Sequence, residues 1–81
     1  MEKGMSMDSR TLAVRAMLRA MAPSASIPYI RSFQLPEEEE FVLIECDARG
    51  KSVQQVAQER SASPETIWRR RRSALMKIAK N

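Results

Sequence analysis

Apolar residues recur at helical spacing along most of the 81-residue chain, and only two glycines interrupt it, so the pattern predicts an all-α protein. The first predicted helix begins at Asp8 or Ser9, whose side chains can accept hydrogen bonds from its first turn, and ends before Pro23. Its polar positions form one narrow stripe, Thr11, Arg15 and Arg19. Because its other sides are apolar, we expect a second copy of the chain or another protein to cover it.

Residues 22–34 are predicted to be a connector that docks on the rest of the chain. Two prolines and three serines argue against a long helix, so we expect only a short helical turn from Pro28 to Phe33. Ile27, Tyr29 and Ile30 are too apolar for a free linker. The chain therefore divides into residues 1–34, an N-terminal helix with its docked connector, and residues 35–81, a C-terminal domain.

The clearest helix of the sequence is "LPEEEEFVLIECDARG", residues 35–50. Pro36 stands where a first turn tolerates a missing N–H, four glutamates follow at the positive end of the helix dipole, and Gly50 stands where helices commonly end. Two apolar stripes predict that the helix lies between the C-terminal helices and the N-terminal segment. The stripes are Val42, Leu43 and Cys46 on one side, and Phe41, Ile44 and Ala48 on the other.

Two further helices complete the pattern. Ser52 caps a helix over residues 53–60, and Ser63 caps a longer one over residues 64–79, with Pro64 in its first position. A short helix, a short turn and a longer helix form a helix-turn-helix motif, whose second helix enters the DNA major groove. The predicted fold class is all-α, a small helical domain with a C-terminal helix-turn-helix preceded by an N-terminal helix.

The net charge of +4 conceals an uneven distribution along the chain. Residues 1–34 carry a net charge of +3, residues 35–50 carry −5, and residues 51–81 carry +6. A basic C-terminal third indicates either a nucleic-acid surface or a solvated helix with many salt bridges. Four consecutive arginines, residues 69–72, lie in the second helix of the motif, and this placement favours DNA.

Several classes of function lack support in the sequence. With no histidine, neither a Ser–His nor a Cys–His arrangement can form, so we expect no enzymatic activity and no cofactor. The glutamate run predicts no metal site, because adjacent helical residues diverge; it suits the helix dipole, or alternatively a docking surface for another protein. A single cysteine, expected in the core, suits a cytoplasmic protein. We find no signal peptide and no run of the ~20 apolar residues that span a membrane.

The C-terminal half of the chain resembles region four of bacterial sigma factors. The matching positions, which run in register and without gaps, are Leu35–Pro36–Glu37, Val42–Leu43, Gly50–Lys51–Ser52, Val56–Ala57, Ser63, Thr66–Ile67, Ala74–Leu75 and Ile78. The resemblance implies the fold of that region in a small stand-alone transcription regulator, of the kind found in phages and mobile elements. The sequence departs from the family pattern at Glu59 and Arg60, usually apolar, and at Ser61, usually glycine.

Helical geometry sorts the side chains of the last helix. Ile67, Ala74, Leu75 and Ile78 line one face, which we expect to pack on Val42, Leu43, Val53 and Val56. The opposite face carries the predicted base contacts, which are Glu65, Arg69 and Arg72, with Trp68 at its edge. A guanidinium can pair with guanine, and a carboxylate can accept from cytosine. The resemblance implies promoter contacts for the positions of Glu65, Trp68 and Arg69, although packing is the interpretation we favour for Trp68.

Other polar residues of the motif are predicted to contact phosphates, which position a protein without specifying sequence. They are Lys51, Ser63, Thr66, Arg70, Arg71 and Lys77. We expect Arg71 to lay its stem along the core edge and to direct its guanidinium outward. The expected function is a transcriptional regulator that binds double-stranded DNA sequence-specifically. The alternative is a sigma-like interaction module that binds RNA polymerase or a sigma regulator and has little affinity for DNA.

Overall fold

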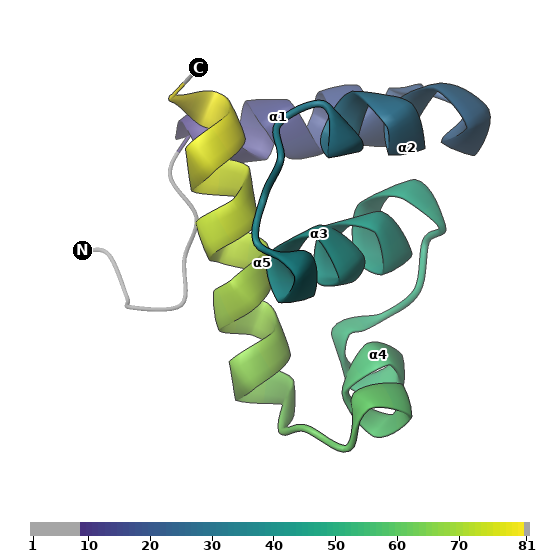
Figure 1. Cartoon of the computed structure of the whole chain (residues 1–81), viewed down its shortest axis with the longest axis vertical. Helices are drawn as coiled ribbons and strands as arrows, with labels where there is room; N and C mark the ends of the chain where they lie inside the picture. Colours follow the sequence, from purple (N-terminus) through teal and green to yellow (C-terminus); the bar gives the residue numbers. More distant parts are fainter. Residues whose placement is uncertain (1–8, 81) are drawn as a thin grey trace.

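The computed structural model describes residues 9–80, and every element that it assigns there is helical (Figure 1). The elements are α1 (Ser9–Ala20), α2 (Pro23–Arg31), α3 (Glu37–Leu43), the π-helical turn η1 (Ile44–Ala48), α4 (Val53–Arg60) and α5 (Pro64–Ala79). The all-α prediction is confirmed. The predicted bounds of the last two helices match α4 and α5, and Gly50 ends the α3–η1 helix with φ +80°. The proposed capping residue Asp8 lies outside the described residues.

The connector differs from its prediction. Instead of a short turn from Pro28 to Phe33, the chain forms the nine-residue helix α2. Pro23 occupies its first turn, where no N–H is needed, and Pro28 lies inside the helix. The buried residues Ser26 and Ile30 share the inner face of α2. Tertiary packing of this face outweighs the low helix propensity on which the prediction relied.

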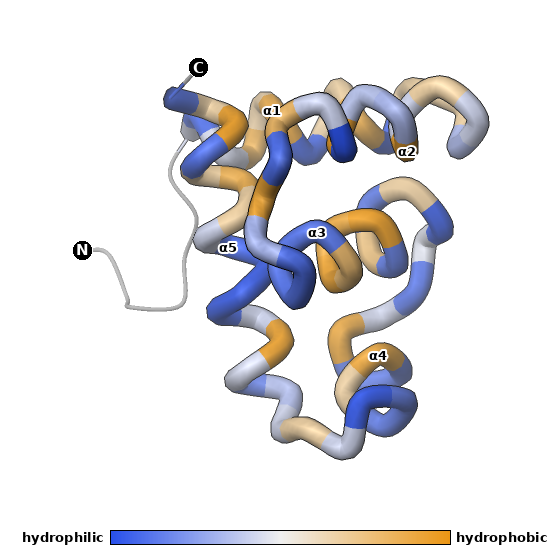
Figure 2. The backbone as a smooth tube through the Cα atoms, viewed as in Figure 1, coloured by the Kyte–Doolittle hydropathy of each residue, from blue (hydrophilic) through white to orange (hydrophobic). Residues whose placement is uncertain are grey.

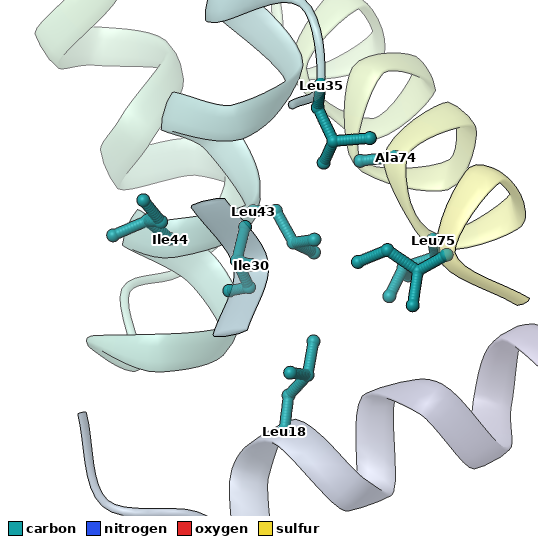
Figure 3. Close-up of a cluster of buried hydrophobic side chains, with 8 residues drawn as sticks. Leu18, Ile30, Leu35, Leu43, Ile44, Ala74 and Leu75 are labelled. Atoms are coloured by element: carbon teal, nitrogen blue, oxygen red, sulfur yellow. The ribbon is translucent and has the colours of Figure 1, made fainter. Parts of the chain in front are cut away.

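One apolar core joins the N-terminal segment to the rest of the chain (Figure 3). Its buried members are Leu18 of α1, Ile30 of α2, Leu35, Leu43, Ile44, and three residues of α5, Ala74, Leu75 and Ile78. α1 packs on α5 and η1, and α2 packs on α3 and η1. The expected docking of the connector is confirmed, and the core crosses the boundary that the sequence placed between residues 34 and 35.

A second apolar cluster holds α4 in place. It consists of Val42, Cys46, Val56, Ala57 and Ile67, with Phe41 and Val53 packed against it. The α3–η1 helix therefore lies between α4 and the N-terminal helices, as predicted. The predicted stripes differ in two residues: Phe41 packs in the cluster of Val42 and Cys46, and Leu43 packs in the other cluster, which holds residues of α5 as well as of the N-terminal helices.

The polar stripe predicted on α1 faces the interior at Thr11 and Arg15, whereas its third residue, Arg19, is exposed. Thr11 is 1% exposed, and Nε of Arg15 lies 3.4 Å from Oδ1 of the buried Asp47. The opposite side of α1 is uncovered in the single chain, where Leu12 is 48% and Met17 41% exposed. The stripe turns inward because η1 supplies a buried carboxylate, which a hydropathy pattern alone does not reveal. Among the described residues, no helix has both the length and the apolar character needed to cross a bilayer.

Candidate nucleic-acid interface

Two serine caps fix the relative placement of α4 and α5. Oγ of Ser52 accepts a hydrogen bond from the N–H of Gln55 at 3.0 Å, and Oγ of Ser63 accepts one from Thr66 at 3.1 Å. Both caps and the position of Pro64 were predicted correctly. Residues 61–63 form the turn, in which Ser61 adopts left-handed backbone angles of φ 54° and ψ 43°. The hydroxyls of Ser63 and Thr66 lie 2.9 Å apart at the start of α5.

The outer side of α5 carries the predicted base contacts. Ile67, Ala74, Leu75 and Ile78 are buried as expected, so the side chains opposite them face solvent. Glu65 and Arg69 have side chains 71% and 69% exposed, with 4.0 Å between Oε2 and Nη2. Arg72 is half-buried, and no carboxylate among residues 9–80 pairs with it. Trp68 is half-buried and belongs to neither apolar cluster.

Arg71 does not direct its guanidinium outward, and this expectation was wrong. The residue is 8% exposed; its Nε donates to Oδ2 of Asp47 at 3.0 Å, and its Nη2 donates to Oδ1 at 2.8 Å. Burial, the largest single influence, lowers the pKa of Arg71, but its hydrogen bonds to Asp47 and the attraction of that carboxylate together outweigh burial and raise the pKa of the guanidinium. In this conformation Arg71 anchors α5 to η1 and is closed to a phosphate.

The other predicted phosphate contacts of α5 meet the glutamates of α3. Arg70 lies 3.2 Å from Glu38, and Lys77 lies 2.9 Å from Glu39, whose carboxylate also accepts from Ser73 at 3.0 Å. Figure 2 shows the hydrophilic start of α3 beside the hydrophilic middle of α5. The glutamate run thus binds α5 in addition to facing the helix dipole. The opposite charges of residues 35–50 and 51–81 were the sequence signal for this contact.

Residues that depart from the sigma pattern also take part in surface contacts. Arg60 lies 3.1 Å from Glu38, and its guanidinium stacks 4.0 Å from the centroid of Phe41. Glu59 lies 3.1 Å from Nζ of Lys51. Hydrogen bonds to Glu45 and Glu59 raise the pKa of Lys51, so this cation is already neutralised locally. Charged residues are therefore accommodated at these two positions without entering the core.

A polar groove of about 490 Å³ lies beside the turn between α4 and α5. Its walls include Arg60 and Arg70, with the carboxylate of Glu38 between their guanidiniums. An anion in the groove would compete with the carboxylate of Glu38 for the two guanidiniums. The groove thus carries two guanidiniums and two carboxylates, those of Glu38 and Glu59, so its charges balance within the chain.

Comparison of the chain with protein-family models, with curated proteins and with solved structures finds no match. A function is therefore inferred from the arrangement of α4 and α5 and from the charges of their surfaces.

Proposed function

We propose that this protein is a sequence-specific DNA-binding transcriptional regulator that places α5 in the major groove. The observation that carries the proposal is the outer side of α5, which presents Glu65, Arg69 and Arg72 directly opposite its buried side. The geometry of a short helix, a turn and a longer helix suits groove entry. The resemblance of residues 35–78 to sigma region four supports the same placement.

The unpaired cation on this side suits direct contact with bases. Arg72 is free of carboxylates among the described residues, and Arg69 has only the long contact to Glu65. A guanidinium that pairs bidentately with guanine contributes about 1–3 kcal/mol of discrimination against the wrong base. Glu65 can accept a hydrogen bond from a cytosine amino group in the same groove.

Phosphate contacts would come from the start of α5 and from cations before α4 and along α5. Ser63 and Thr66 hold hydroxyls at the N-terminus of α5, where the helix dipole also attracts an anion. Lys51, Arg70 and Lys77 must exchange a glutamate for a phosphate. Such exposed ion pairs are weak, so a polyanion can displace them. Arg71 supports the interface by holding α5 on Asp47.

Substitution of the two arginines tests the proposal. A duplex selected from random sequences would be titrated with the full chain, and fluorescence anisotropy would give the affinity. We expect Arg69→Ala or Arg72→Ala to weaken binding by about 10- to 100-fold and to relax sequence preference. Arg49→Ala, which removes a cation paired with Glu45 near the end of η1, serves as the matched control. Unchanged affinity and preference in both test variants would refute the proposal.

A second candidate function is favoured by the uncovered side of α1. Leu12 and Met17 expose large apolar side chains on one helix, a feature more common at protein contacts than on free surfaces. In this alternative the protein is a sigma-like module that binds RNA polymerase or a sigma regulator. Retention on immobilised polymerase, lost in Leu12→Glu, together with no mobility shift on DNA, would favour it over the DNA-binding proposal.

A further inference from the structure

Most basic side chains among residues 9–80 pair with a carboxylate. The exceptions are Arg10, Arg19, Arg72 and Lys80. A paired cation must give up its carboxylate before it can meet a phosphate, whereas an unpaired cation loses only water and counterions. The unpaired side chains are therefore the positions where this molecule best accepts a polyanion.

Three of these four cations lie on one continuous surface. Arg72, Met76 and Lys80 follow one another at four-residue spacing on α5, so they share the side that also carries Arg69. Arg10 lines the same surface depression as Met76 and Lys80. The first turn of α1 therefore lies beside the C-terminal end of α5, where Figure 1 shows the two helices crossing.

We propose that Arg10 and Lys80 form a phosphate-binding extension of the DNA interface, through which α1 contacts the same duplex as α5. This inference rests on the proposed function. At 1.5 Å per residue, Lys80 lies about 22 Å along the helix axis from Glu65, whereas the major groove is about 12 Å wide. A helix with its first turns in the groove carries Lys80 out over a sugar–phosphate strand.

The position of Arg10 strengthens the extension. It lies in the first turn of α1, where free N–H groups and the positive end of the helix dipole favour an anion. Arg19 is also unpaired and lies on the same helix, nine residues later and about 13 Å further along the axis. The exposed apolar side of α1, with Leu12 and Met17, separates the two arginines around the helix. The two arginines thus form a matched pair, of which only Arg10 adjoins α5.

The experiment measures binding of the full chain to a selected duplex and to an unrelated duplex of the same length, across a series of salt concentrations. Arg10→Ala and Lys80→Ala should each weaken binding to both duplexes by a similar factor, about 3- to 10-fold. Each should also make the negative slope of log K against log salt less steep by about 0.9, the change expected for the loss of one phosphate contact. Arg19→Ala should leave affinity within about twofold of the unaltered chain.

The experiment distinguishes failure of the phosphate-binding extension from failure of the proposed function. If Arg72→Ala impairs binding while both Arg10→Ala and Lys80→Ala retain the original affinity and slope, the extension is wrong and the proposed function stands. A loss confined to the selected duplex would assign a base contact and would also overturn the phosphate role. If the unaltered chain binds neither duplex, the extension and the proposed function fall together.

Discussion

At the scale of single residues, Asp47 connects more of the molecule than any sequence pattern indicated. Its buried carboxylate accepts two hydrogen bonds from Arg71 of α5 and lies 3.4 Å from Nε of Arg15 of α1. The π-helical turn widens the helix at this point and lets four consecutive residues, Ile44 to Asp47, all be buried. The packing of both α1 and α5 on η1 therefore depends on the charge of Asp47.

Removal of this carboxylate should be costly. Asp47→Ala leaves Arg71 buried without its partner, and loss of one member of a buried ion pair typically costs about 3–5 kcal/mol. Urea unfolding followed by circular dichroism measures the loss. The double variant Asp47→Ala/Arg71→Leu is the control and should recover much of the stability, because it removes the buried guanidinium together with its partner and leaves only the half-buried Arg15 without its carboxylate. A single-variant loss below about 1 kcal/mol would show that the pair does not hold η1 to α5.

The turn at Ser61 offers a stabilising substitution. Left-handed backbone angles are strained for a residue with a Cβ, so Ser61→Gly should raise the free energy of unfolding by about 0.5–1 kcal/mol. Gly50→Ala is the mirror control, since Gly50 has φ +80° and no atom within 4 Å of an added Cβ. It should destabilise by a similar amount through the backbone alone. Equal stability of Ser61→Gly and the parent chain would contradict this account.

At the scale of elements, the proposed function makes α3 a competitor of DNA for cations of α4 and α5. Glu38 holds Arg60 and Arg70, and Glu39 holds Lys77, so these carboxylates occupy the positions that phosphates would take. The acidic residues 35–50 thus lie against part of the basic segment 51–81. Affinity for DNA should then depend on how readily α3 yields these contacts.

Neutralising the two carboxylates should strengthen binding. Glu38→Gln removes the carboxylate that Arg60 and Arg70 share, and Glu39→Gln removes a carboxylate from Lys77. Each variant is expected to raise affinity for duplex DNA about 3- to 10-fold at ~0.1 M salt, because exposed ion pairs are weak. Glu37→Gln is a matched control, because it removes the same charge from the same helix without breaking a described ion pair. An equal gain in all three variants would attribute the effect to net charge alone.

Sequence patterns predicted the elements whose signals are local. Ser52, Ser63 and Pro64 define helix starts through their own chemistry, and α4 and α5 follow with the predicted bounds. The helix α2 was not predicted because its stability comes from Ile30, which packs on residues from other parts of the chain.

The inward turn of Arg71 escaped prediction for a related reason. Its buried partner lies 24 residues earlier in the chain, on a π-helical turn that no local pattern indicates. The base-contact residues Arg69 and Arg72 lie on the outer side of α5, where helical periodicity placed them, and their role in DNA binding stays a prediction.

At the scale of the whole molecule, the uncovered side of α1 bears on self-association. Leu12 and Met17 lie near opposite edges of a stripe that also contains Ala13, Ala16 and Ala20. The small residues between them permit close approach of another helix. Binding to palindromic half-sites would require a dimer, and this stripe is the surface on which we expect one to form.

Sedimentation equilibrium of the full chain tests this expectation. We expect a concentration-dependent dimer that Leu12→Glu or Met17→Glu abolishes, with Gln54→Glu on the exposed side of α4 as the control. Deletion of residues 1–34 is not a suitable comparison, because Leu18 and Ile30 belong to the core. A monomeric mass for the unaltered chain at all concentrations would refute self-association.

The core that joins Leu18 and Ile30 to Leu75 and Ile78 sets the order of events during synthesis. Residues of α1 must wait for α5 to leave the ribosome before they can be fully covered, because α1 packs on α5, more than forty residues later in the chain, whereas α2 packs on the nearer α3 and η1. Translation proceeds at about 5–20 residues per second, so these apolar faces stay open for several seconds. The nascent chain is therefore most exposed to chaperones and proteases before its last helix emerges.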